Sequence, residues 1–203
     1  MKLSQKLVLL AAVLTLFSMI IGSLSIWGMS NINHDVKDIS KNWLPTIKVV
    51  GEISGMVNEF RRNELVHILA TDEGLMREYE NKMRVLIGKI SDKTKEYEKL
   101  ITEPEEKLAF PKFMSAWNGY IANNAKVEEL AKQNKTEDAV KLVLGPARTQ
   151  YIDALQQLQI IIDVNNKGSQ ASAINAEEDY TNGKLLSISL IIAAIIAATA
   201  IST

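Results

Sequence analysis

The chain has 203 residues, of which 47% are hydrophobic, with a formal net charge of −1 and no cysteine. This charge balance argues against a nucleic-acid-binding protein, and the lack of cysteine excludes disulfide scaffolds and thiolate metal sites. Lys2 and Lys6 are the only charges before His34, and no charge follows Lys184. Residues 28–184 hold 21 of the 23 basic residues and all 24 acidic ones, a net charge of −3 that is typical of a water-facing domain.

An uncharged run of 21 residues occupies positions 7–27. About 20 apolar residues in a helix match the thickness of a bilayer core, so this run predicts a first transmembrane helix. Lysines in the preceding tail, residues 1–6, place that tail in the cytoplasm by the positive-inside rule and send the next domain outside. A cleaved signal peptide is the alternative interpretation. The length of the run and the poor cleavage site at Ser23-Leu24-Ser25 favour an uncleaved anchor.

A second apolar run, 185–201, is just long enough to span a bilayer, and we assign residues 185–203 to a second transmembrane helix. A natural protein rarely ends inside its last span without a basic flank. We therefore expect a cytoplasmic part to follow residue 203.

Helical periodicity dominates the segment between the two runs. Every seventh residue from Ile39 to His67, and again from Asn42 to Ala70, forms a mostly apolar stripe of the kind that buries one face of a helix. Pro45 falls in the first turns of this pattern, where it either starts a new helix or kinks a longer one.

Three turns divide the segment into four long helices. They lie at Thr71–Gly74, with Thr71 or Asp72 as an N-cap, at Thr102–Glu105, with capping-box spacing between those two residues, and at Gly145-Pro146. The later helices are expected at about 74–100, at 104–133 and from Pro146 through the second span, with a short helix over 136–144. Their expected core faces include Leu75, Met83, Leu86, Ile90, Tyr97, Leu108, Phe113, Trp117, Tyr120, Ala154, Leu158 and Ile161. The fold class is therefore all-α: residues 28–184 form an antiparallel four-helix bundle flanked by two transmembrane helices.

Motifs for catalysis are missing from the sequence. It contains no GxSxG, P-loop or GxGxxG pattern, and the two histidines, His34 and His67, lack metal-ligand spacing. We therefore expect no enzyme activity, no metal site and no cofactor. The carboxylates lie at the spacing of a solvent face; Glu103, Glu105 and Glu106 mark a helix start.

Two polar clusters depart from this surface pattern. Arg61 and Arg62 lie deep in the first helix of the domain, and Arg148, Thr149 and Tyr151 follow the break before the fourth helix. If these helices are neighbours, the clusters face one another at similar height. Arginines can then clamp a carboxylate bidentately, with the two hydroxyl groups as further donors. A small carboxylate is therefore the predicted ligand.

Structural roles are the alternative for these residues. Arg61 and Arg62 can instead form surface ion pairs with Glu59 or Glu64. His67 is a further candidate for ligand contact, and its alternative role is that of a hydrogen-bonded histidine at a helix interface.

The layout of a basic tail, an apolar run, a helical segment of 157 residues and a second apolar run resembles bacterial methyl-accepting chemotaxis receptors with a four-helix-bundle sensor domain. Trp43-Leu44-Pro45-Thr46 is similar to the Leu-Pro motif near the start of the first sensor helix in that family, and the stretch at Arg61 and Arg62 follows it. Glu137-Asp138-Ala139 resembles the lead-in to the fourth helix. The resemblance covers the whole chain through loose motifs, so it identifies architecture better than ligand.

This resemblance implies a multi-pass protein of the bacterial inner membrane with residues 28–184 in the periplasm. It implies a homodimer, or a higher oligomer, that pairs through the first helix of the domain and binds an amino acid or organic acid. It also implies a cytoplasmic part, a helical relay and a coiled coil with methylated glutamates, that acts on a kinase and an adaptor to control chemotaxis.

The aspartate receptor is one branch of that family, and the resemblance to it is partial. Its ligand arginines come from the first helices of both subunits, and a Thr-containing segment at the start of the fourth helix completes the site. Arg61 or Arg62 corresponds to the first arginine, and Arg148 lies in the helix-four segment. Val66 and Ala70 occupy the places of the arginines one and two turns further along. That departure favours a carboxylate other than aspartate.

The leading hypothesis is a transmembrane chemoreceptor that signals by a small displacement of its fourth helix. Two alternatives remain open. One is the sensor region of a membrane histidine kinase or cyclase, and the other is a bundle that recognises a periplasmic binding protein.

Overall fold

The computed structural model describes residues 2–202, which contain helices and short turns but no strand. Residues 1 and 203, the outermost residues of the predicted tail and second span, lie outside the described residues. The chain divides into two compact units, Met1–Lys41 with Ser169–Thr203, and Asn42–Gly168. The all-α class predicted from the sequence is confirmed.

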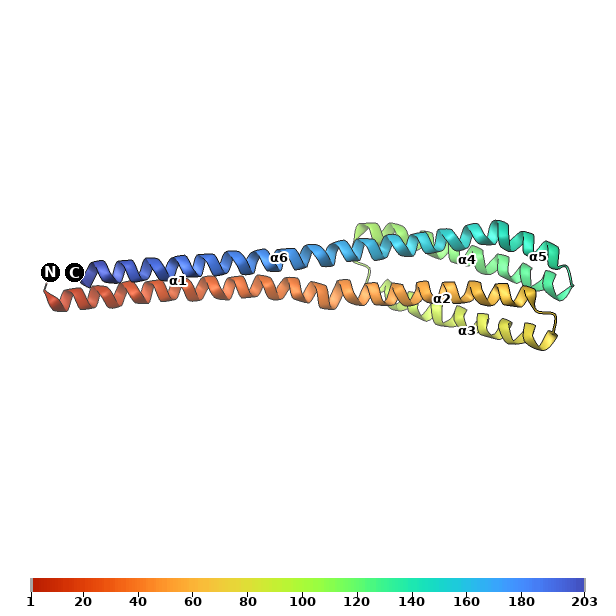
Figure 1. Ribbon diagram of the computed structural model, residues 1–203, viewed down its shortest axis with the longest axis horizontal. Helices are drawn as coiled ribbons and strands as arrows, with labels where there is room; N and C mark the ends of the chain where they lie inside the picture. The colour runs from red at the N-terminus through yellow and green to blue at the C-terminus, as the bar shows by residue number, and fades with distance from the viewer. Residues whose placement is uncertain (1, 203) are drawn as a thin grey trace. The chain divides into compact units, whose positions relative to one another are not determined.

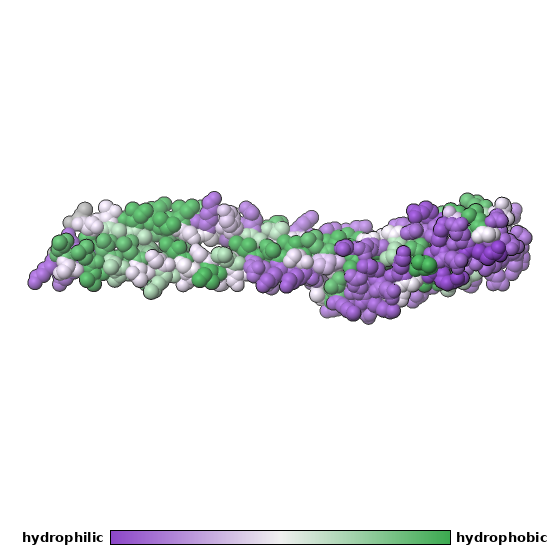
Figure 2. All heavy atoms as spheres, turned by 90° about the horizontal axis from the view of Figure 1, so that it is seen from below, coloured by the Kyte–Doolittle hydropathy of each residue, from purple (hydrophilic) through white to green (hydrophobic). Residues whose placement is uncertain are grey.

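The first unit consists of α1 (Leu3–Asp38) and the last part of α6 (Arg148–Ser202), which lie side by side (Figure 1). No residue of α1 is buried. The helical stretches Leu3–Leu69 and Thr136–Ser202 each contain an 18-residue window apolar enough to cross a membrane, and neither window has a buried residue. Figure 2 shows apolar surface gathered over this unit. Two candidate membrane spans therefore flank the second unit in the sequence.

Helical structure continues from α1 through the π-helical segment η1 (Ile39–Trp43) into α2 (Leu44–Leu69). Pro45 lies in the first turn of α2. A proline lacks the N–H group, and its ring crowds the carbonyl group four residues earlier. The wider π-helical turn before Pro45 accommodates that crowding, so the helix starts again without a break.

The second unit is a bundle of α2, α3 (Glu73–Glu98), α4 (Pro104–Lys132) and the first part of α6 (Figure 1). The short helix α5 (Thr136–Leu142) and the π-helical segment η2 (Val143–Ala147) connect α4 to α6. Gly145 leaves the helical backbone region, with φ −100° and ψ −110°. The break expected at Gly145-Pro146 is therefore present.

Side-chain caps fix where α3 and α4 begin. Asp72 is the N-cap of α3, and its Oδ2 accepts a hydrogen bond from the Leu75 N–H at 2.8 Å. The N-cap of α4 is Glu103, which forms a capping box with Glu106, so the predicted capping box from Thr102 is one residue too early. Pro104 explains the difference, because proline favours the first helical position and makes the residue before it the N-cap.

The core of the bundle is built mainly from the predicted stripes. Its buried apolar residues include Val49, Val50, Ile53, Val57, Phe60, Met83, Leu86, Ile90, Tyr97, Phe113, Trp117, Tyr120, Ala154, Leu158 and Ile161. The Phe60 ring makes edge contacts with Trp117 and Tyr120, at centroid distances of 5.2 and 5.4 Å. Leu108 was expected in the core but is 67% exposed, because Ala109 takes the inward position of that turn.

Gly168 of α6 lies directly under an aromatic ring. A methyl group built on Gly168 would lie 2.7 Å from the Trp43 indole. Contacts this short do not occur between real side chains, so the indole and the α6 backbone can approach only because this residue is glycine.

We expect Gly168→Ala to lower the free energy of unfolding by about 1–3 kcal/mol, because the added methyl group displaces the Trp43 ring. Gly88→Ala in α3 is the matched control, since a methyl group there meets no atom within 4 Å. It should stabilise the bundle by about 0.5–1 kcal/mol. Thermal unfolding of the chain in lipid nanodiscs, followed by circular dichroism, measures both. Equal stability of the two variants would contradict the close packing of Trp43.

Candidate functional site

The predicted binding residues lie on two helices of the bundle. They are Arg61, Arg62 and His67 of α2, and Arg148, Thr149 and Tyr151 in the first turn of α6. Two of them meet: the Arg61 guanidinium carbon lies 5.5 Å from the centroid of the Tyr151 ring. Arg61 Nη2 also donates a hydrogen bond to the carbonyl oxygen of Val143 at 3.0 Å. The two helices are thus neighbours at this level.

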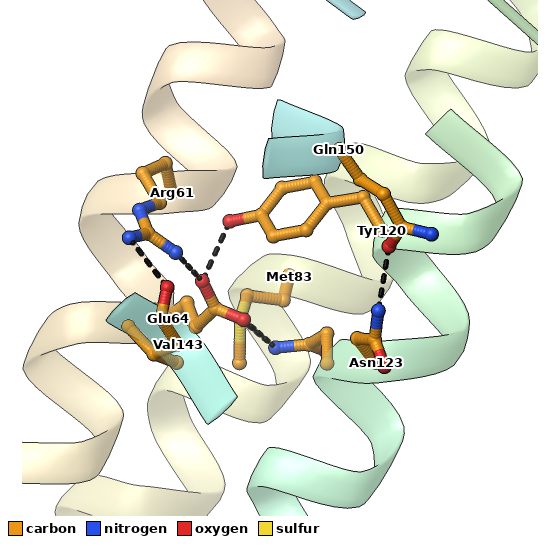
Figure 3. A network of polar contacts seen from close by, with 8 residues as sticks. Arg61, Glu64, Met83, Tyr120, Asn123, Val143 and Gln150 are labelled. Atoms are coloured by element: carbon orange, nitrogen blue, oxygen red, sulfur yellow. Dashed lines mark hydrogen bonds and ion pairs between the residues drawn. The ribbon is translucent and has the colours of Figure 1, made fainter. Parts of the chain in front are cut away.

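Glu64 balances the charge of Arg61 (Figure 3). This carboxylate is fully buried, and it accepts hydrogen bonds from Arg61 Nη1 at 2.8 Å, the Tyr120 hydroxyl at 2.6 Å and Asn124 Nδ2 at 3.1 Å. A buried carboxylate is tolerated when it is paired and hydrogen-bonded in this way. The ion pair with Glu64 that was the structural alternative is therefore present, but in the bundle interior rather than on the surface.

Tyr120 is held as a permanent hydrogen-bond donor. Burial, reinforced by the negative charge of Glu64, raises the pKa of Tyr120 far above its ordinary value. The hydroxyl group therefore stays protonated and donates a hydrogen bond to Glu64 at any physiological pH.

A second buried carboxylate, Glu106, stands at the start of α4. It accepts hydrogen bonds from the Tyr97 hydroxyl at 3.1 Å and from Asn165 Nδ2 at 2.7 Å, and it also caps two backbone N–H groups. Burial and the charge of Glu106 raise the pKa of Tyr97 in the same way. The expectation that Glu106 faces solvent is wrong. Pro104 was the available signal, because it places Glu106 at the capping-box position that points back into the turn.

The other two arginines, Arg62 and Arg148, are exposed. Between their helices, the Tyr151 hydroxyl donates to Asn58 Oδ1 at 2.6 Å. α2 and α6 run antiparallel, since Tyr151 meets Asn58 while Gly168 meets Trp43. Arg62 follows Asn58 by four residues and Arg148 precedes Tyr151 by three, so both lie one helical turn beyond this hydrogen bond in the same direction.

We call the surface where α2 and α6 meet near Arg62 and Arg148 the arginine seam. Arginines on neighbouring helices can hold a carboxylate between them through paired, charge-assisted hydrogen bonds. Thr149 is also exposed, and its hydroxyl donates to the Gly145 carbonyl at 3.4 Å. The chemistry of the seam suits a small anion.

His67 lies apart from these residues. It is fully buried, and its Nε2 is 3.0 Å from Glu80 Oε1, which also receives Lys132 Nζ at 3.2 Å. Within residues 2–202, no group of three or more His, Asp or Glu side chains is arranged to hold a metal ion.

Comparison with known families gives this architecture its context. The family described as a four helix bundle sensory module for signal transduction matches residues 1–180. The chain belongs to this family. The resemblance to chemotaxis receptors with a four-helix-bundle sensor is thereby confirmed.

A relative from Bacillus subtilis (strain 168) extends the comparison. The chain is 22% identical over 194 residues to a protein named as a sensory transducer, YvaQ. The aligned region covers 96% of this chain and 34% of that protein. The chain thus spans about a third of the length of this relative.

Replacing the buried Glu64 tests how much the bundle depends on it. We expect Glu64→Gln to lower the free energy of unfolding by about 3–5 kcal/mol, because Arg61 is then left inside the bundle without its counter-charge. Glu78→Gln is the control, since Glu78 makes an ion pair with Lys82 on the exposed side of α3. The urea concentration at the midpoint of unfolding should be the same for that variant as for the wild type. If both variants lost a similar amount of unfolding free energy, the buried position of Glu64 would have no special role in stability.

Proposed function

We propose that this sensory module is the membrane-spanning receptor part of a chemoreceptor, and that it binds a small organic acid or amino acid at the arginine seam. The observation that carries the proposal is the placement of the exposed Arg62 and Arg148 one turn beyond the Asn58–Tyr151 hydrogen bond. A carboxylate bound by both arginines, with Thr149 as a further donor, joins α2 to α6. Arg61 and Tyr151 lie beneath these arginines, where they contact each other. His67 is buried against Glu80, apart from the seam, and takes no part in this binding.

Signalling follows from the helix that carries half of the seam. α6 runs without interruption from Arg148 to Ser202, so the ligand-binding turn and the second candidate span belong to one helix. A ligand that holds Arg148 against Arg62 favours one position of α6 over others. The ligand's different affinity for these positions shifts their populations, and the shifted position of α6 carries the signal across the membrane.

The orientation in the membrane rests on charge. Lys2 and Lys6 precede the first candidate span, which assigns the N-terminus to the cytoplasm and the bundle to the outside of the inner membrane. In this orientation, the bundle binds its ligand in the periplasm or an equivalent extracellular space.

The similarity to a sensory transducer, of which this chain spans a third, supports the proposal of signalling partners inside the cell. We assign to the remaining part a helical relay that acts on a kinase and an adaptor to control chemotaxis, and no catalytic role to the chain itself. A histidine kinase or cyclase output is the second candidate. We also propose that the receptor is a homodimer paired through α2, whose exposed face carries Gly51, Gly55 and Leu65 together with Arg62, so that the partner subunit lies beside the seam.

Thermal unfolding of the chain in lipid nanodiscs tests the ligand class. A carboxylic acid present at about 100 times its dissociation constant should stabilise the bundle by roughly 2.7 kcal/mol. We expect such a shift with at least one mono-, di- or tricarboxylic acid. Arg62→Ala and Arg148→Ala should each remove it, because each takes away a charge-assisted bidentate partner.

Arg84→Ala is the matched control, since Arg84 is an exposed arginine of α3 that donates a hydrogen bond to Asn81 Oδ1 at 2.8 Å. It should leave the shift unchanged. A shift that survives the double change of Arg62 and Arg148 would remove the seam as the site. No shift with any acid would point instead to recognition of a periplasmic binding protein.

A further inference from the structure

A cavity of about 580 Å³ lies at the end of the bundle that carries the α2–α3 and α4–α5 turns. We call it the tip cavity. It opens between the first turns of α3 and the last turn of α4, away from Arg62 and Arg148. Its volume falls within the usual range for small-molecule sites, about 300–1,000 Å³.

Side chains of both charges line the tip cavity. Glu73, Arg77 and Glu80 are spaced so that they share one face of α3, and Lys132 faces them from α4. Arg77 Nη1 is 3.2 Å from Glu73 Oε2, and Lys132 Nζ is 3.2 Å from Glu80 Oε1. Both cations are more than half exposed and can turn toward a ligand, whereas the Glu80 side chain is only 10% exposed. The cavity therefore offers one fixed anion, Glu80, one exposed anion, Glu73, and two movable cations.

His67 fixes the position of Glu80. Its ring is fully buried behind Glu80 and contacts Oε1 through Nε2, while its Nδ1 has no hydrogen-bond partner among the described residues. Burial opposes the charge on Glu80, but the hydrogen bonds from His67 and Lys132 outweigh it, so the pKa of Glu80 lies below its ordinary value. Both of these bonds go to Oε1, which leaves Oε2 to accept from a further donor.

Glu128, one turn before Lys132 on α4, responds to the same negative charge. Burial raises the pKa of Glu128, and the nearby charge of Glu80 raises it further. His67, Lys132 and Arg84 act in the opposite direction without cancelling the shift. A positive group of a ligand placed beside Glu80 would therefore be attracted by this negative charge.

The apolar part of the lining is small and lies beside the charges. Met76 lies one helical turn before Glu80 on α3, and Ala131 precedes Lys132 on α4. A ligand that uses the charges thus has room for a short side chain against a flexible methionine.

We propose that the tip cavity binds a small zwitterion of the free amino acid type, with its ammonium group on Glu80, its carboxylate between Lys132 and Arg77, and its side chain against Met76 and Ala131. His67 is a positioning residue for Glu80. This site lies beyond the proposed function, because it requires neither arginine of the seam, and it needs both charges of the ligand where the seam needs only a carboxylate.

The test uses the full chain in lipid nanodiscs and the twenty common L-amino acids at millimolar concentrations. We expect at least one of them to raise the unfolding temperature. For each amino acid that does so, the acid without the amino group and the amine without the carboxylate are compared at the same concentration, and neither should match the shift.

Variants locate the binding. Lys132→Met should weaken binding of the amino acid by about 10- to 100-fold, the range expected for the loss of one charge-assisted hydrogen bond. Lys132 is 54% exposed, so this variant should keep the wild-type helix content without ligand. Glu80→Gln should weaken binding similarly. Lys82→Met, which removes a lysine paired with Glu78 on the outer side of α3, is the control and should bind as the wild type does.

Three outcomes would overturn the proposal: no shift with any of the twenty amino acids, an equal shift with the deaminated acid, or unchanged binding by Lys132→Met. Loss of amino acid binding in Arg62→Ala with retention in Lys132→Met would place the ligand at the arginine seam instead. Because the seam is tested with simple carboxylic acids and its own variants, failure at one site leaves the result at the other unaffected.

Discussion

The carboxylate of Glu64 is the interaction on which the arrangement of the bundle depends. It projects from α2 into the interior and binds Tyr120 and Asn124 of α4, while it neutralises Arg61, which in turn holds the Val143 carbonyl next to α6. Apolar side chains can pack in several registers at similar cost, but a buried charge is tolerated only where all its partners meet it. The positions of α2, α4 and the start of α6 are thereby tied together.

Glu106 repeats this device at the start of α4. Each of the two glutamates is fully buried and accepts hydrogen bonds from one tyrosine and one asparagine; for Glu106, these come from α3 and α6. Through Asn165, Glu106 fixes a later turn of α6 than the one near Arg61. The Tyr151–Asn58 and Asn165–Glu106 hydrogen bonds hold α6 at two levels of the bundle and so limit how the helix can move, as the proposed signalling role of α6 requires.

Much of the fold is readable from the sequence because helix patterns are local. The heptad stripe of α2, the cap at Asp72 and the break at Gly145 depend only on neighbouring residues, and the structure contains all three. Leu108 and Glu106 were misplaced for a related reason: both lie in the first turns of α4, where the inward face depends on the residue at which the helix begins. One residue of error there turns the face by about 100°.

For the candidate site, the sequence by itself determined which side chains carry charge and on which helix, and so it singled out Arg61, Arg62 and Arg148 as well as the two candidate spans. Only the tertiary structure decided that Arg61 is paired inside the bundle with Glu64 while Arg62 remains exposed. Likewise, only folding brings His67, Glu80 and Lys132 together from three helices. The physical reason is that a charge is balanced by whichever partners packing places within hydrogen-bond distance, and those partners are remote in the sequence.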